Sequence, residues 1–242
     1  MRMLRLCVIG DPVAHSLSPK LHGEMLQKAG IDGSYEAVTV KLEELADFVA
    51  RAKAGAYDGF NVTMPHKETI LPLLDELAPS AQTMGAVNTV VVRNGRAIGY
   101  NTDGDGLVRS LPELPKKAVV LGNGGAAKAV SRALRQNGVE VAICARHPVG
   151  EQVPWCEREN AVADCELLVN ATCLGMTGKE QFADFGFLKC LPENAVVYDL
   201  VYEPQKTKLL QEAEILCHPI AEGLALLKSQ AELAFTIFTT VK

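Results

Sequence analysis

The residues from 118 to 134 constrain the fold of this chain more than any other stretch. Ala118 to Leu121 form a short apolar run, which predicts a buried strand. Gly122, Gly124 and Ala127 follow with the spacing G-x-G-x-x-A, and apolar residues then recur at the spacing of an amphipathic helix. In a strand, turn and helix, the first Gly allows the tight turn, the second lets the backbone approach a pyrophosphate, and the Ala lets the helix approach the strand. Glycine-rich turns also occur without ligands, but the flanking strand and helix favour a dinucleotide site.

Length and composition narrow the class of partner. The chain has 242 residues, 48% of them hydrophobic, and the glycine-rich turn lies near its midpoint, so we expect two domains. A formal net charge of −5 provides no basic surface for nucleic acid or an anionic membrane, which favours a small-molecule partner. Apolar runs are too short for a membrane span or a secretion signal, and we expect a cytoplasmic protein. The seven cysteines lack C-x-x-C spacing and the five histidines are scattered, so we expect reduced thiols and no metal site.

The first half of the chain alternates strand and helix patterns, which predicts an α/β domain with a mostly parallel sheet. A strand over residues 4–9 is followed by Ser16 and Ser18. Ser18 precedes Pro19 and is a good N-cap, whereas Ser16 has no such structural role and follows a strand end, where open α/β sheets bind ligands. We expect the helix that follows to direct three residues towards the core: Leu21, Met25 and Ala29.

Two further groups of polar residues follow. Asn61, Thr63 and Lys67 lie around the end of a strand predicted over residues 60–63, and Pro65 suits the first turn of a helix expected to continue to residue 74. A hairpin is predicted from 89–92 and 97–100 by the turn residues 94 and 95, Asn-Gly, and its pairing brings Asn88 near Asp103. A solvated lysine and a helix-capping aspartate are the simpler interpretations of Lys67 and Asp103.

Seven motifs in the right order are similar to those of the shikimate dehydrogenase family. They are SLSP at 16–19, NVTMPHK at 61–67, GAVNT at 85–89, NTDG at 101–104, GNGGAAKA at 122–129, NATCLGM at 170–176 and DLVYEPQKT at 199–207, and Gln230 follows. The resemblance implies an N-terminal α/β substrate domain over 1–110, completed by a C-terminal helix over 221–242. It also implies a C-terminal Rossmann NADP-binding domain over 111–220. Pro112 and Pro115 predict a linker between the two domains over residues 111–117.

The resemblance also implies an activity and a set of site residues. The activity is the NADP-dependent, reversible reduction of 3-dehydroshikimate to shikimate, an oxidoreductase reaction of chorismate and aromatic amino acid biosynthesis. Lys67 and Asp103 would be the catalytic pair. The substrate would be surrounded by Ser16, Ser18, Asn61, Thr63, Asn88, Tyr202 and Gln230. The cofactor would be bound by Gly122, Asn123, Gly124, Gly125, Ala126, Ala127, Arg146, Asn170, Ala171, Thr172, Met176, Leu200 and Gly223. We expect a monomer or a homodimer.

These residue types suit that chemistry. Shikimate is a small carboxylate with three ring hydroxyls, and Ser, Thr, Asn, Tyr and Gln supply short-range donors and acceptors. Oxidation of its secondary alcohol releases a proton as the hydride leaves, and a Lys beside an Asp can transfer that proton. Two alternatives remain at this point, a quinate/shikimate dehydrogenase with relaxed NAD/NADP use and a non-catalytic metabolite sensor. A sensor would not need both Lys67 and Asp103.

The cofactor motif departs from the usual pattern of the family. The second Rossmann strand, predicted over 139–145, ends in Ala145-Arg146-His147, where relatives often have Asn-Arg-Thr. The strand also lacks the Asp or Glu that binds the ribose hydroxyls of NAD, which favours NADP with Arg146 as the main phosphate ligand. Glu222 and Gly223 open a segment that replaces the usual D-G-x-G-M-L, and a helix is predicted from there to about residue 240.

Overall fold

The computed structural model describes residues 3–240, which form two compact units. The first unit contains residues up to 102 and from 230 onward, and the second contains residues 103–229. These boundaries differ from the expected ones at 110 and 220. The reason is that α5 (Asp103–Ser110) places Leu107 in an apolar cluster of the second unit, with Val130 and Leu134. Residues 111–116 therefore connect two elements of one unit and do not link domains.

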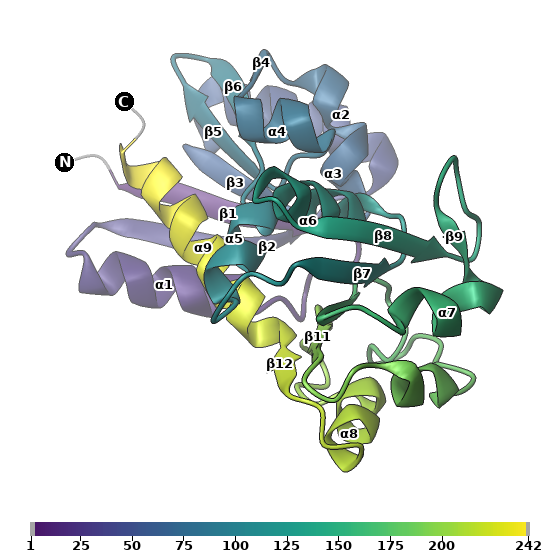
Figure 1. Ribbon diagram of the computed structural model, residues 1–242. Coiled ribbons are helices and arrows are strands. Elements are labelled where there is room, and N and C mark those ends of the chain that lie inside the picture. Colours follow the sequence, from purple (N-terminus) through teal and green to yellow (C-terminus); the bar gives the residue numbers. More distant parts are fainter. Residues whose placement is uncertain (1–2, 241–242) are drawn as a thin grey trace. The chain divides into compact units, whose positions relative to one another are not determined.

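The first unit is built on a six-stranded mixed sheet with the order β2-β1-β3-β5-β6-β4. Its strands are β1 (Leu4–Gly10), β2 (Gly33–Thr39), β3 (Gly59–Val62), β4 (Glu76–Leu77), β5 (Thr89–Arg93) and β6 (Arg96–Tyr100) (Figure 1). Its helices are α1 (Ser18–Lys28), α2 (Leu45–Arg51), α3 (His66–Thr69), α4 (Pro79–Met84) and the second part of α9 (Gly223–Thr240). β1 is parallel to β2 and β3, whereas β3, β5 and β6 are antiparallel to one another in turn along the sheet.

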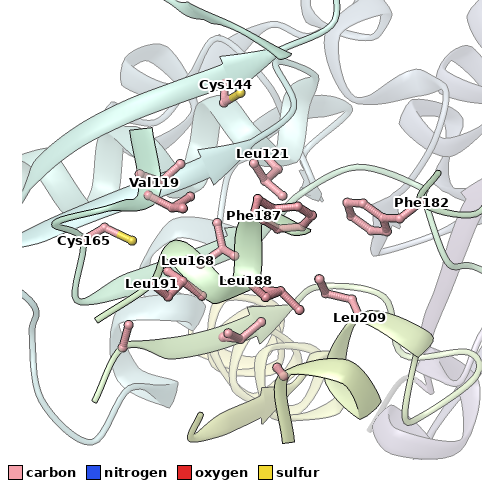
Figure 2. Close-up of a cluster of buried hydrophobic side chains, with 14 of the residues drawn as sticks. Val119, Leu121, Cys144, Cys165, Leu168, Phe182, Phe187, Leu188, Leu191 and Leu209 are labelled. Atoms are coloured by element: carbon pink, nitrogen blue, oxygen red, sulfur yellow. The ribbon is translucent and has the colours of Figure 1, made fainter. Parts of the chain in front are cut away.

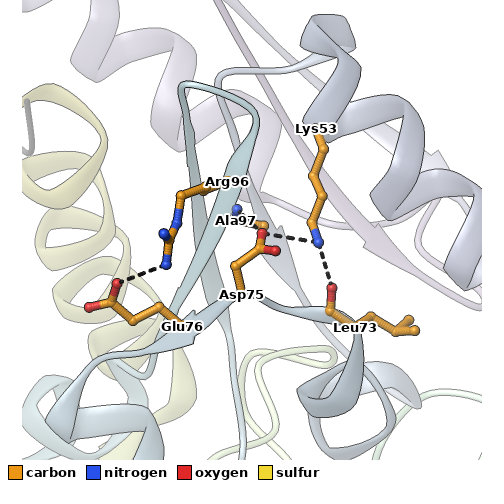
Figure 3. Close-up of polar contacts among 6 residues, drawn as sticks. All are labelled: Lys53, Leu73, Asp75, Glu76, Arg96 and Ala97. Atoms are coloured by element: carbon orange, nitrogen blue, oxygen red, sulfur yellow. Dashed lines mark hydrogen bonds and ion pairs between the residues drawn. The ribbon is translucent and has the colours of Figure 1, made fainter.

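The predicted hairpin is confirmed. Asn94 and Gly95 have φ angles of 52° and 74°, as a two-residue turn with positive φ requires, and Thr89 pairs with Tyr100. The short strand β4 is held to β6 by side chains as well as by backbone (Figure 3). Asp75 accepts a hydrogen bond of 2.7 Å from the Ala97 N–H and lies 3.0 Å from Lys53 Nζ, which donates to the Leu73 carbonyl.

Two local expectations for the first unit are wrong. The helix α1 buries Ser18, His22 and Leu26, and not the face that carries Leu21, Met25 and Ala29. The reason is a ring contact: His22 stacks on Tyr35 of β2 at 4.3 Å, which rotates that face of the helix towards the sheet. The helix after Pro65 ends at residue 69 and a 3-10 turn over Leu71–Leu73 follows, because Pro72 has no N–H and disfavours helical geometry at the residue before it.

The second unit contains a six-stranded parallel sheet with the order β12-β11-β10-β7-β8-β9. Its strands are β7 (Lys117–Leu121), β8 (Glu140–Ala145), β9 (Val153–Pro154), β10 (Leu167–Asn170), β11 (Val196–Asp199) and β12 (Ile220–Glu222). Its helices are α5, α6 (Gly125–Gln136), α7 (Arg158–Val162), α8 (Lys208–Ile215) and the start of α9. The expected strand, tight turn and helix at 118–134 are confirmed as β7, Gly122 with φ of 103° and α6.

Alternate residues of these strands enter two cores, one on each face of the sheet. Val119 and Leu121 face a cluster that includes Leu168, Phe187 and Leu209 (Figure 2). On the opposite face, a second cluster is formed by residues of β7, β10, β11 and the helices α5, α6 and α9 that cover them: Leu107, Ala118, Val120, Ala127, Val130, Leu134, Val169, Tyr198 and Leu226. Helices on both faces of a parallel sheet define the doubly wound fold expected for this half.

Among residues 3–240, no helix is long and apolar enough to cross a membrane. The same residues contain no cluster of His, Cys, Asp and Glu side chains that could hold a metal ion.

Candidate functional site

Asn61 is the centre of a buried polar network in the first unit. It is the third residue of β3, and the pairing of β3 with β5 places it opposite Thr89. Its Nδ2 group donates to the Asn88 carbonyl and to Thr89 Oγ1, both at 3.0 Å, and its Oδ1 atom accepts from the Tyr35 hydroxyl at 2.6 Å. These contacts fix which way the amide faces, so its remaining acceptor capacity has one direction.

Asn88 extends this network to Thr102, which follows β6, and through Thr102 to Gln230 on α9. Its Nδ2 group donates to Thr102 Oγ1 and its Oδ1 atom accepts from the Thr102 N–H, both at 2.9 Å. The Thr102 hydroxyl lies 3.4 Å from Gln230 Oε1 on α9. The hairpin therefore brings Asn88 to Thr102, the residue that immediately precedes its predicted neighbour Asp103. The hairpin produces this contact because residue 88 precedes β5 and residue 102 follows β6.

The start of α1 is stabilised by Ser16 and not by Ser18, the expected N-cap. Ser16 Oγ accepts from the Ser18 N–H at 3.2 Å, so Ser16 stabilises the start of α1. Ser18 makes no cap hydrogen bond and is the first residue of α1. Its buried hydroxyl hydrogen-bonds the Tyr35 phenol, which connects Ser18 to Asn61.

Thr63 and Lys67 follow the carboxyl end of β3. The Thr63 N–H donates to the Ile9 carbonyl and the Thr63 carbonyl accepts from the His66 N–H, so the backbone turns directly from β3 into α3. Buried His66 fixes this turn, since its Nε2 atom lies 2.6 Å from the Val40 carbonyl. The Lys67 carbonyl accepts from the Val87 N–H at 2.8 Å, which holds half-buried Lys67 beside the segment that carries Asn88.

Sequence reasoning missed Tyr35, Thr89 and Thr102 as members of this network. Tyr35 lies on β2, far from the motifs along the chain, and its stacking partner His22 is fully buried with both ring nitrogens unpaired. Burial lowers the pKa of His22 to about 3, so its ring is neutral. Thr89 and Thr102 lie inside the GAVNT and NTDG motifs. The predicted hairpin pairs residue 89 with residue 100, and this pairing indicates that both threonines lie near Asn88.

In the second unit, the glycine-rich turn has the geometry that a pyrophosphate site needs. Gly122 has a left-handed φ, and a Cβ there would meet Thr172 Cγ2 at 3.0 Å and the Ala171 carbonyl oxygen at 3.2 Å. Gly124 is the N-cap of α6, and a Cβ there would meet nothing within 4 Å. The first turn of this 12-residue helix holds Gly125, Ala126 and fully buried Ala127. Open space beside unpaired N–H groups at a helix N-terminus suits an anionic ligand.

The loops after β10 and β11 lie beside this turn. The Ala171 N–H donates to the Leu121 carbonyl, and the Leu200 N–H donates to the Asn170 carbonyl. Gly223 lies even closer to the backbone of the loop after β11. A Cβ at this position would lie 2.5 Å from the Leu200 carbonyl oxygen, so the position requires glycine. Half-buried Met176 belongs to the loop that begins at Thr172.

The buried carboxylate of Asp199, the last residue of β11, joins the loops after β10 and β11 by hydrogen bonds. Its Oδ1 atom accepts from Asn170 Nδ2 at 2.9 Å and from the Val201 N–H at 3.0 Å, and its Oδ2 atom accepts from the Thr207 hydroxyl at 2.6 Å. Asn170 Oδ1 in turn accepts from the Thr172 hydroxyl at 2.6 Å. Burial outweighs these hydrogen bonds and raises the pKa of Asp199 to about 6. Asn170 is fully buried, and its side chain holds the Thr172 loop in place.

Arg146 stands immediately after β8 with its side chain 60% exposed. Its Nη1 atom lies 3.0 Å from Glu180 Oε2. Asn123 Nδ2 donates to the His147 carbonyl at 2.9 Å, which joins the glycine-rich turn to the end of β8. The strand end itself carries no acidic residue, but Glu180 of another loop brings a carboxylate to the Arg146 side chain.

The predicted site residues therefore fall into two groups. The first unit holds Ser16, Ser18, Asn61, Thr63, Lys67, Asn88 and Gln230, and the second holds Asp103, Tyr202 and all the predicted cofactor residues. Asp103 is buried at the first position of α5, and half-buried Tyr202 follows β11. Burial and the nearby Glu203 charge raise the pKa of Tyr202.

The chain is similar to proteins of one known family over nearly its whole length. The shikimate dehydrogenase substrate binding domain matches residues 8–90, which lie in the first unit. The chain is 38% identical to the shikimate dehydrogenase (NADP(+)) of Alkaliphilus oremlandii over 97% of its length and 91% of that protein. It is 40% identical to the protein of the same name from Geobacter sp. strain M21, covering 96% and 88%.

A solved structure agrees with these relatives. Shikimate 5-dehydrogenase from Thermus thermophilus, determined in complex with NADP(H) and shikimate, matches with a TM-score of 0.88 and 38% identity over 99% of this chain and 94% of that one. This chain belongs to the shikimate dehydrogenase family.

Proposed function

We propose that this protein is an NADP-dependent shikimate dehydrogenase, which reduces 3-dehydroshikimate reversibly to shikimate in chorismate and aromatic amino acid biosynthesis. The observation that carries the proposal is the hydrogen-bonded network around Asn61 and Asn88, within a chain that also has an open glycine turn at a helix N-terminus. The first unit would bind the substrate and the second the cofactor. A cytoplasmic monomer or homodimer fits this role.

Substrate recognition is assigned to the polar residues of the first unit, with Tyr202 from the second. Ser18 is linked to this network through Tyr35 and Gln230 through Thr102, and Ser16 and Thr63 would supply further hydroxyl groups. A ligand with a carboxylate and three hydroxyls needs such an array of short donors and acceptors. Because Tyr35 and Thr102 hold the two asparagine amides in one orientation, the array is set before the substrate arrives.

Proton transfer is assigned to Lys67 and Asp103. Reduction of the ketone requires a proton on the developing alkoxide oxygen, and a lysine ammonium group can donate it. Asp103 would orient that ammonium and the reacting hydroxyl. In the reverse direction the Lys67 amine accepts the proton of the alcohol. NADPH, when bound, supplies the hydride.

The second unit fits an NADP molecule. Gly122, Gly124 and the N-terminal residues of α6 suit the pyrophosphate, and Arg146 has the guanidinium that pairs with a phosphate in two parallel hydrogen bonds. Asn123 joins the two regions, and the loops of Asn170 to Thr172, Met176, Leu200 and Gly223 would enclose the remainder of the cofactor.

The test is a steady-state assay of NADPH formation from shikimate and NADP⁺. We expect saturable turnover, a lower kcat/KM with NAD⁺, and a lower kcat/KM with quinate. Absence of turnover with shikimate and either cofactor would overturn the proposal and leave a metabolite sensor as the function.

A further inference from the structure

The ion pair between Arg146 and Glu180 places a carboxylate beside the guanidinium group of the residue that follows β8. Both residues belong to the second unit, and their side chains are 60% and 73% exposed with 3.0 Å between Nη1 and Oε2. Rossmann domains that bind NAD commonly carry an Asp or Glu at the end of the second strand, where it accepts hydrogen bonds from the ribose hydroxyls. Here Arg146 follows that strand, and the acid is provided by a loop 34 residues further along.

Backbone hydrogen bonds hold Glu180 in this position. The loop after β10 turns back on itself, with the Gly175 N–H donating to the Glu180 carbonyl at 2.9 Å and the Lys179 N–H donating to the Met176 carbonyl at 3.0 Å. Gly175 and Gly178 have φ angles of 89° and 76°, which allow these tight turns. The start of the same loop contains Thr172 and Met176, which we assign to the cofactor site.

We propose that Glu180 is a specificity-determining residue that shifts cofactor choice towards NAD by competing with the 2′-phosphate of NADP for Arg146. This inference rests on the proposed function. To bind the phosphate, the guanidinium must give up its carboxylate partner, and the phosphate must tolerate a second anion nearby. An unphosphorylated ribose meets neither cost, and its hydroxyls can donate to the carboxylate.

The size of the effect follows from the exposure of the pair. Exposed ion pairs contribute little, so loss of the competitor should change the preference only about two- to fivefold at low ionic strength. The variant Glu180→Gln keeps the shape of the side chain and removes its charge. Glu193→Gln is the matched control, because Glu193 is an exposed acid that precedes β11, at the amino end of its strand.

The experiment is isothermal titration calorimetry of the full chain with adenosine 2′,5′-bisphosphate and with adenosine 5′-monophosphate, accompanied by kcat/KM for NADP⁺ and NAD⁺. We expect Glu180→Gln to raise the affinity ratio of bisphosphate to monophosphate about two- to fivefold and to raise the NADP⁺/NAD⁺ ratio in the same direction, whereas Glu193→Gln changes neither. An unchanged or lowered ratio in Glu180→Gln overturns the inference. If the wild-type protein turns over shikimate, that result leaves the proposed function standing, whereas a wild type that binds neither nucleotide and turns over nothing overturns both.

Discussion

The substitution Gly223→Ala tests whether α9 must begin against the backbone of the loop after β11. A Cβ at residue 223 would lie 2.5 Å from the Leu200 carbonyl oxygen and 2.7 Å from both the Leu200 carbonyl carbon and the Val201 carbonyl oxygen. Real Cβ atoms essentially never approach closer than 3.0 Å and ordinary contacts begin at 3.4 Å, so the backbones must separate by about 0.5–0.9 Å. All three obstructing atoms are backbone, and no side-chain rotation can relieve the clash.

The expected cost is that of overpacking in a buried region, about 1–3 kcal/mol of the free energy of unfolding. For a chain of this length, that corresponds to a fall in Tm of roughly 2–12 °C. Differential scanning calorimetry would measure it. Because the displaced backbone carries Leu200, the affinity for NADP⁺ should also fall.

Gly124→Ala is the matched control, since a Cβ there meets nothing within 4 Å. Its free energy of unfolding should change by at most about 1 kcal/mol, which is the scale of a weaker N-cap. Its affinity for NADP⁺ should fall, because the methyl group occupies space assigned to the pyrophosphate. A Gly223→Ala protein with wild-type Tm would refute the steric reasoning, and a Gly124→Ala protein with wild-type NADP⁺ affinity would refute the assignment of the turn.

Three further perturbations test separate parts of the structure. Burial raises the pKa of Asp199 to about 6, above its value of about 3.9 in an unfolded chain, so the folded state binds this proton more readily and stability should fall as the pH rises from about 4 to about 6. The amide of Asp199→Asn can donate to Thr207 as a protonated carboxyl would, so this variant should lose less of its free energy of unfolding between about pH 4 and about pH 6, as measured by urea titrations. An unchanged dependence on pH would show that Asp199 is not its cause. Tyr35→Phe should raise the KM for shikimate about two- to tenfold with a smaller change in kcat, because it removes the hydrogen bond that orients the Asn61 amide, whereas Tyr57→Phe, which loses only an exposed bond to Glu36, should not. Arg146→Ala should lower the ratio of kcat/KM for NADP⁺ to that for NAD⁺, and a constant ratio would place phosphate recognition elsewhere.

The features predicted correctly from sequence depend on local chemistry. Asn94-Gly95 fixes a hairpin because few residues tolerate two successive positive φ angles, and the hairpin alone brings Asn88 to the segment before Asp103. Gly122 and Gly124 likewise define a strand, turn and helix within a short window. In both cases a few adjacent residues determine the geometry.

The features that were missed depend on contacts between distant segments. The buried face of α1 is set by the stacking of His22 on Tyr35, and a polar residue on a helix does not predict burial. The boundary after Thr102 depends on Leu107 joining a core whose other members lie on later strands and helices. Glu180 reaches Arg146 through a loop with two positive-φ glycines, and the sequence alone does not indicate which strand end such a loop approaches.

The most direct test of the central claim is the kcat for shikimate oxidation in Lys67→Ala, with the exposed Lys20→Ala as the control. If Lys67 transfers the proton, kcat should fall about 10²–10⁴-fold, while the Tm and the dissociation constant for NADP⁺ remain at wild-type values. Lys20→Ala should retain wild-type turnover. A Lys67→Ala enzyme with near-normal kcat would contradict the account.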